Sequence, residues 1–171
     1  MTQYQLLHTT IIKTLASLMR IVEKGELHAK DNGLADEVLL NARLAPDMFP
    51  FVSQVRIATD DARRNLYLLA GKEHIKMEDN ETTFAELKVR ILKTQELVAS
   101  LTDKDFEGAD DRQVSLYWMG GAYILGKDFI QEFALQNTLF HTITAYDILR
   151  NQGVKIGKMD FIGPMSMHQV K

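Results

Sequence analysis

Four separate segments of the chain carry apolar residues at helical spacing. Steps of three and four residues place such side chains on one face of a helix. The segments cover residues 4–28, 50–70, 83–102 and 127–151. Four amphipathic helices can bury their apolar faces only against one another, so the pattern predicts a four-helix bundle.

Capping residues indicate where some of these helices begin and end. Thr83 and Glu86 form a T-x-x-E sequence, in which the hydroxyl accepts from the backbone of Glu86 and the carboxylate reaches back. Pro50 suits the first turn of a helix, where its missing N–H is not needed, and Gly71 is a typical C-terminal cap. Between the first two helices, turn-forming residues predict a connector with a short helix around residues 36–42.

The spacing changes between residues 112 and 125, where apolar and polar side chains alternate as in a strand. Gly120 and Gly121 follow this run and permit the positive φ angles of a two-residue turn. We expect a β-hairpin over residues 113–125, packed on one end of the bundle because two strands alone are marginal in water. The prediction is therefore one all-α domain with a small β-hairpin, residues 1–171.

Composition argues against several classes of function. Twenty Lys and Arg stand against 23 Asp and Glu, a net charge of -3, and no basic stripe is present. We therefore expect no nucleic-acid partner. The absence of cysteine excludes disulfides, thiolate metal sites and cysteine nucleophiles. Since no apolar run is long enough for a membrane span or a signal peptide, we expect a soluble cytoplasmic protein with no membrane partner.

Three separated segments carry a resemblance to a known family. They are Asn41–Phe51 (NARLAPDMFPF), Glu81–Thr94 (ETTFAELKVRILKT) and Phe140–Phe161 (FHTITAYDILRNQGVKIGKMDF). In this order they resemble the signature segments of a bacterial family of unknown function in the DinB/YfiT-like superfamily. The resemblance covers nearly the whole chain. It implies a DinB-like four-helix bundle, commonly a homodimer, in a superfamily whose better-known members are metal-dependent enzymes.

In the superfamily pattern, a divalent ion is held by one histidine near the start of the second helix and two on the fourth, four residues apart. His141 could be the first of that pair, but Ala145 stands in the second position. Asn137, four residues earlier, is a poor substitute for an imidazole, and residues 50–71 contain no histidine. We therefore expect no metal cofactor, and an interior His141 that bonds to a hydroxyl or a carbonyl.

A carboxylate of the second helix is the alternative source of a metal ligand. Asp60 and Asp61 are the candidates. Arg56 and Arg64 each lie four residues from Asp60 and Arg63 lies three residues after it, so ion pairing explains Asp60 more simply. If the metal alternative holds, His141 would bind a divalent ion such as zinc or nickel. By analogy the protein would then be a thiol-directed transferase.

The best candidate for a functional pocket is the bundle interior or its mouth, near the middle of the fourth helix. The polar groups there would come from that helix and from the connector before residue 50, which its prolines stiffen. The candidate residues are Asn137, His141, Thr144, Tyr146, Arg43 and Asp47.

Three functions remain open at this point. The favoured one is a bundle that binds a small molecule or a partner without a superfamily-type metal site. The second is a DinB-type metal-dependent enzyme that uses His141. The third is a structural homodimer, which the apolar faces of the first or fourth helix would form.

Overall fold

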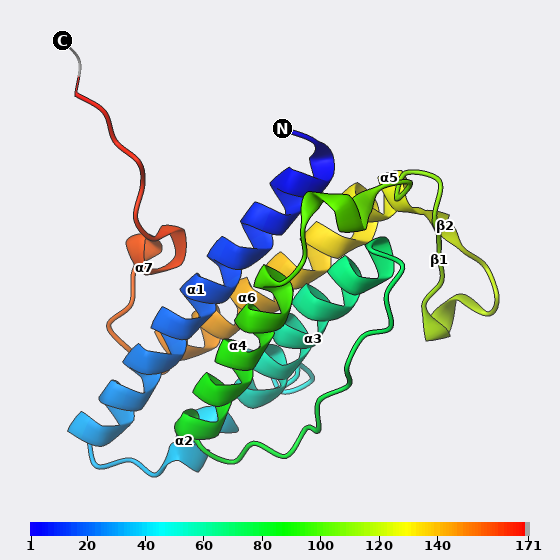
Figure 1. The fold of residues 1–171 in the computed structure, drawn as a ribbon. Helices are drawn as coiled ribbons and strands as arrows, with labels where there is room; N and C mark the ends of the chain where they lie inside the picture. The colour runs from blue at the N-terminus through cyan, green and yellow to red at the C-terminus, as the bar shows by residue number, and fades with distance from the viewer. Residues whose placement is uncertain (170–171) are drawn as a thin grey trace.

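Four long helices lie side by side in the computed structural model, which describes residues 1–169 (Figure 1). Counted in chain order, the first long helix packs against the third and the fourth long helices. The second long helix packs against the same two. The long helices are α1 (Gln3–Asp31), α3 (Phe51–Leu69), α4 (Phe84–Ala99) and α6 (Leu135–Asn151). The short elements are α2 (Asp36–Leu40), β1 (Gln113–Val114), β2 (Ile124–Leu125), α5 (Gly126–Phe129) and α7 (Lys158–Ile162).

The predicted all-α fold with a small hairpin is confirmed, and local capping explains where the helices begin. At the start of α4, Glu86 N donates to Thr83 Oγ1 at 3.2 Å and Thr83 N donates to Glu86 Oε2 at 3.0 Å. The same arrangement joins Thr2 and Gln5 at the start of α1. These reciprocal bonds satisfy backbone N–H groups that have no partner inside the helix.

The fourth predicted helix, residues 127–151, is not one regular α-helix. A π-helical segment, Ile130–Ala134, joins α5 to α6. The rings of Phe129, just before this segment, and Phe133, within it, are stacked with their centroids 5.6 Å apart. Single π-helical turns are frequent at functional sites. The apolar spacing did not predict this segment because neither proline nor glycine marks it.

The hairpin is present, but the predicted two-residue turn at Gly120 and Gly121 is wrong. Each strand has two residues, and the register pairs Gln113 with Leu125. Residues 115–123 form a longer connection that contains a 3-10 turn, Tyr117–Met119. Gly120 ends this turn with a φ of 59°. The alternating side chains of the connection therefore belong to a turn and not to a ladder.

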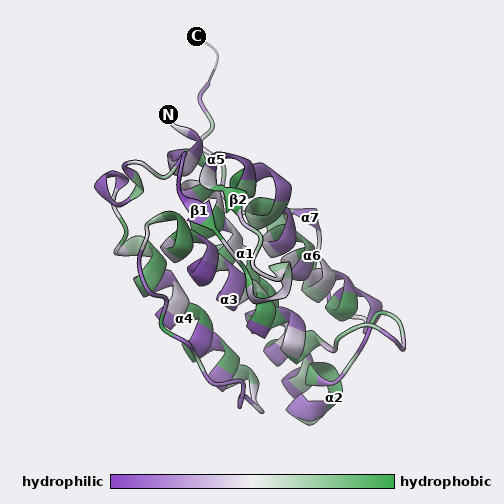
Figure 2. Cartoon of the chain, turned by 90° about the vertical axis from the view of Figure 1, so that its right-hand side faces the viewer, coloured by the Kyte–Doolittle hydropathy of each residue, from purple (hydrophilic) through white to green (hydrophobic). Residues whose placement is uncertain are grey.

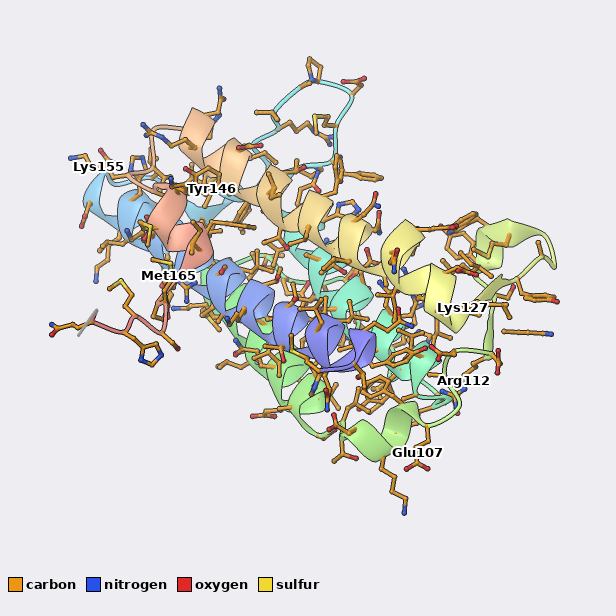
Figure 3. The ribbon with its side chains drawn as sticks, turned by 90° about the horizontal axis from the view of Figure 1, so that it is seen from above. Glu107, Arg112, Lys127, Tyr146, Lys155 and Met165 are labelled. Carbon is orange, nitrogen blue, oxygen red and sulfur yellow. The ribbon has the colours of Figure 1, made fainter. Side chains whose placement is uncertain are left out.

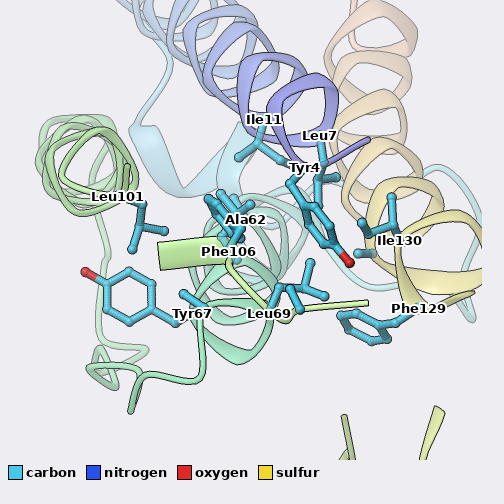
Figure 4. Close-up of a cluster of buried hydrophobic side chains, with 14 of the residues drawn as sticks. Tyr4, Leu7, Ile11, Ala62, Tyr67, Leu69, Leu101, Phe106, Phe129 and Ile130 are labelled. Atoms are coloured by element: carbon cyan, nitrogen blue, oxygen red, sulfur yellow. The ribbon is translucent and has the colours of Figure 1, made fainter. Parts of the chain in front are cut away.

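Two groups of buried apolar side chains fill the bundle, one toward each end. The group at the hairpin end joins Tyr4 and Leu7 of α1 to Phe106 and Phe129 (Figure 4). Hydrophobic and hydrophilic residues alternate around the long helices, as the amphipathic pattern requires (Figure 2). Gly126 lets two segments approach closely at this end, because a Cβ there would lie 2.0 Å from the backbone oxygen of Ala109.

The segment after α6 folds back on the bundle, and α7 packs against α1. Arg20 Nε donates to the backbone oxygen of Asp160 at 3.0 Å, and Lys24 pairs with the Asp160 carboxylate at 2.7 Å. The Ser17 hydroxyl donates to the backbone oxygen of Phe161. Within residues 1–169, no helix has the length and apolar character needed to cross a bilayer.

Candidate functional site

A cavity of about 380 Å³ lies between α3, α6 and the connection of the hairpin. One part of its lining is aromatic and the other part is polar, with Ile57 between them. The aromatic side chains are those of Phe49, Tyr117, Trp118 and Phe133. The polar side chains are those of Asp60, Asp61, Arg64, Asn137 and His141.

A larger hollow, of about 540 Å³, lies along α4 and the connection that precedes it. Its buried polar residues, Glu81 and Arg90, already bond to each other at 2.8 Å. Its other charged side chains, such as Lys76 and Lys93, are exposed. This hollow therefore offers no buried polar group that needs a ligand, unlike the cavity between α3 and α6.

The hydrogen bonds of Gln54 determine the state of His141. Gln54 Nε2 donates to the backbone oxygen of Phe49 at 3.1 Å, which only accepts. The amide oxygen of Gln54 therefore faces His141 and accepts from Nδ1 at 2.7 Å. Burial lowers the pKa of His141, so the ring is neutral and carries its proton on Nδ1. The lone pair of Nε2 is left as an acceptor.

Asp61 lies next to His141 in the lining and is almost fully buried, with 1% of its surface exposed. Arg64 Nη2 donates to one carboxylate oxygen and Asn137 Nδ2 to the other. Burial raises the pKa of Asp61 to about 6, against the opposing effects of Arg64 and Asn137. Since the amide nitrogen of Asn137 is engaged, its oxygen remains as an acceptor.

The ion pairing expected for Asp60 is present with Arg63, whereas the other two expected partners, Arg56 and Arg64, bond elsewhere. Asp60 Oδ1 accepts from Arg63 at 2.8 Å and from Arg90 of α4 at 2.7 Å. Arg64 pairs with Asp61 and Arg56 pairs with Glu81. Helical spacing brings both flanking arginines within reach of Asp60, but packing turns Arg64 toward α6 and Arg56 toward the connection before α4.

Of the four candidate residues on α6, the structure brings Asn137 and His141 into the cavity and leaves the other two outside it. Thr144 is buried, three residues beyond His141. Tyr146 packs against the core at the other end of the bundle, far from Lys127 and the hairpin (Figure 3). Tyr146 lies five residues beyond His141 and therefore points to another side of the helix. Thr144 points in a direction close to that of His141, but it lies further along α6 and is buried there.

The two candidate residues of the connector, Arg43 and Asp47, are exposed and do not line the cavity. Arg43 Nη1 donates to the backbone oxygen of Met48, which closes the connector on itself. The connector contributes Phe49 instead. Arg43 and Asp47 were candidates because they are polar residues of the connector. In the structure, the aromatic ring of Phe49 is the connector side chain that lines the cavity.

Sequence reasoning missed Gln54, Arg64 and the aromatic lining. One signal for Gln54 was available, since it interrupts the apolar stripe of α3 between Phe51 and Ala58 and is 1% exposed. A buried amide in such a stripe needs hydrogen-bond partners. No comparable signal marks Trp118, which enters the lining only because the connection of the hairpin lies beside Phe133, with ring centroids 5.7 Å apart.

A comparison with protein families places residues 3–162 in the family described as Domain of unknown function (DUF1993). The chain belongs to the DUF1993 family. It is also similar to the crystal structure of a DinB family member protein from Shewanella denitrificans, with 37% sequence identity and a TM-score of 0.92. That match covers 98% of this chain and 95% of the other. No curated protein matches the chain.

In this DUF1993 protein, three residues resemble the superfamily metal pattern in their spacing, but two of them are amides, and only Asn137 and His141 line the cavity. Gln54 lies near the start of α3, and Asn137 and His141 lie four residues apart on α6. Ala145, four residues after His141, is fully buried in the core and offers no ligand. The residues present do not fit a three-imidazole centre.

The remaining ionisable groups do not supply that centre either. Asp61 already accepts from Arg64 and Asn137. In the part of the chain that the structure describes, no three His, Cys, Asp or Glu groups come close enough to hold a metal ion. What the DUF1993 site presents is a neutral imidazole, a buried carboxylate and an aromatic mouth.

Proposed function

We propose that this protein binds a small organic molecule in the cavity between α3 and α6, without a superfamily-type metal centre. The observation that supports the proposal most is the fixed tautomer of His141. Its Nδ1–H is held by Gln54, so Nε2 is an acceptor already oriented for a ligand before binding. Preorganisation of this kind lowers the entropic cost of binding.

The size and the lining of the cavity support the same proposal. About 380 Å³ lies within the range of roughly 300–1,000 Å³ that small-molecule sites occupy. Phe49, Tyr117 and Trp118 in its lining are 59%, 92% and 54% exposed. A ligand that covers these rings would remove apolar surface from water, which favours binding.

We expect a panel of small aromatic compounds to contain binders whose NMR shift changes fall on α3, α6 and the hairpin connection. Replacing His141 with alanine is expected to weaken the best binder about tenfold, the effect of losing one hydrogen bond. His168→Ala, on the exposed tail, is the matched control and should leave the affinity unchanged. A silent panel, or shift changes elsewhere on the molecule, would count against the proposal.

Elemental analysis of protein purified without a histidine tag tests the metal-free part of the proposal separately. The expected content of zinc, nickel and iron is far below one equivalent. A stoichiometric metal content that disappears in the His141→Ala variant would establish the metal-dependent alternative instead.

We also propose that the outer face of α6 forms a homodimer. Phe140 and Ile143 on this face are 55% and 43% exposed, although they lie in the middle of a long helix. Large apolar side chains in such a position favour a symmetric contact with a second copy. We expect sedimentation at micromolar concentration to give a dimer, and Ile143→Glu to give a monomer. A monomeric wild-type protein would overturn this part.

A further inference from the structure

Building on the proposed function, we infer that the cavity selects an organic amine, a cation with N–H donors attached to an aromatic or apolar body. The inference rests on which hydrogen-bonding groups the protein has already used. The Nδ1–H of His141, one N–H of Gln54 and one N–H of Asn137 each bond to another protein group. His141 Nε2 and Asn137 Oδ1 remain as acceptors, and each amide keeps a second N–H donor.

The charges in the lining also favour a cation. Two carboxylates, Asp60 and Asp61, line the cavity together with one guanidinium, that of Arg64. Arg63 and Arg90, which pair with Asp60, do not line the cavity, and only 2% of each side chain is exposed. They offset the charge of Asp60 from outside the lining, so a ligand meets more carboxylates than guanidinium groups there. An ammonium group could bond to carboxylate oxygens that have spare lone pairs.

The aromatic mouth provides the third complementary feature. The rings of Trp118 and Phe133 meet at 46°, with centroids 5.7 Å apart, and Phe49 and Tyr117 complete the lining on that side. The faces of aromatic rings carry partial negative charge and attract ammonium groups. Acceptors and aromatic faces in the same lining are together suited to a protonated amine.

Arg64, in contrast, favours a negatively charged ligand. Its Nη2 bonds to Asp61, but its Nε is buried and bonds to no protein group in residues 1–169. A carboxylate ligand would need this guanidinium and would have to lie close to Asp61. We favour the amine because the two lining carboxylates outnumber the single lining guanidinium.

Three probes with the same ring and different charge test this choice: benzylamine, benzyl alcohol and benzoate. By NMR titration near neutral pH, we expect benzylamine to bind at least about tenfold more tightly than benzyl alcohol, and benzoate to bind most weakly. Asp61→Asn should bring the affinity for benzylamine to within about threefold of that for benzyl alcohol. The affinity for benzyl alcohol should change less than the affinity for benzylamine.

A second variant tests the same inference in case Asp61→Asn does not fold. Trp118→Leu changes a side chain that is 54% exposed on the hairpin connection, and it should weaken benzylamine more than benzyl alcohol. Tightest binding by benzoate, or equal binding by amine and alcohol, would overturn the amine inference and leave the proposed function standing. Failure of all three probes would overturn the inference, and if the wider aromatic panel is silent as well, the proposed function falls with it.

Discussion

Replacing Arg90 with methionine is expected to lower the free energy of unfolding by about 3 kcal/mol. Arg90 is 3% exposed, and its guanidinium bonds to Glu81 at 2.8 Å and to Asp60 at 2.7 Å. It also donates to the hydroxyl of Thr59 at 2.8 Å and to the backbone oxygen of Glu78 at 2.9 Å. Methionine fills much of the same volume but leaves these buried acceptors without their donor.

The estimate lies at the lower end of roughly 3–5 kcal/mol for a broken buried pair because both carboxylates keep another arginine. Glu81 keeps Arg56 at 2.8 Å and Asp60 keeps Arg63 at 2.8 Å. Burial acts to raise the pKa of Glu81, but the hydrogen bonds and charge of the surrounding groups lower it overall. Glu81 is therefore ionised in the folded protein.

Urea unfolding followed by circular dichroism measures the loss, and Lys88→Met on the same helix is the matched control. Lys88 pairs with Glu26 at 2.5 Å, with 28% and 36% of the two side chains exposed. Exposed pairs contribute about 1 kcal/mol or less. Equal losses in the two variants would show that the network around Arg90 does not hold the connection before α4 on α3.

Replacing Asp61 with asparagine is expected to remove a pH dependence from the stability of the protein. The pKa of this carboxyl is about 6 in the folded chain, against an ordinary value of 3.8. Between these values the folded state keeps a proton that the unfolded state has released, so this group makes stability fall as pH rises. Relative to the wild type, Asp61→Asn should gain about 2–3 kcal/mol of stability between about pH 4 and pH 7.

The difference between the variant and the wild type is the quantity to measure, because contributions from other titrating groups then cancel. Unfolding by urea at several pH values gives it directly. Asp111→Asn makes the same chemical change at an exposed position and should show no such trend. Parallel pH profiles for Asp61→Asn and the wild type would mean that the buried carboxyl titrates as it does in the unfolded chain.

Several features were predictable because they depend on residues that are near neighbours in the chain. The positions of the long helices follow from apolar residues three and four apart, and the start of α4 follows from Thr83 and Glu86. His141 was expected to be an interior histidine that bonds to a carbonyl, and its Nδ1 does bond to an amide oxygen. What could not be named was the partner, Gln54, which is 87 residues away.

The sequence by itself determined the set of amphipathic helices, their caps and the replacement of the superfamily's histidines, since these depend on residue type and local spacing. Only the tertiary structure decided that Gln54 orients His141, that Asn137 bonds to Asp61, and that the hairpin connection brings aromatic rings to the cavity. The physical reason is that these contacts depend on how α3 and α6 are rotated against each other. Helical periodicity identifies the buried face of each helix, but it leaves open which side chains of two such faces meet.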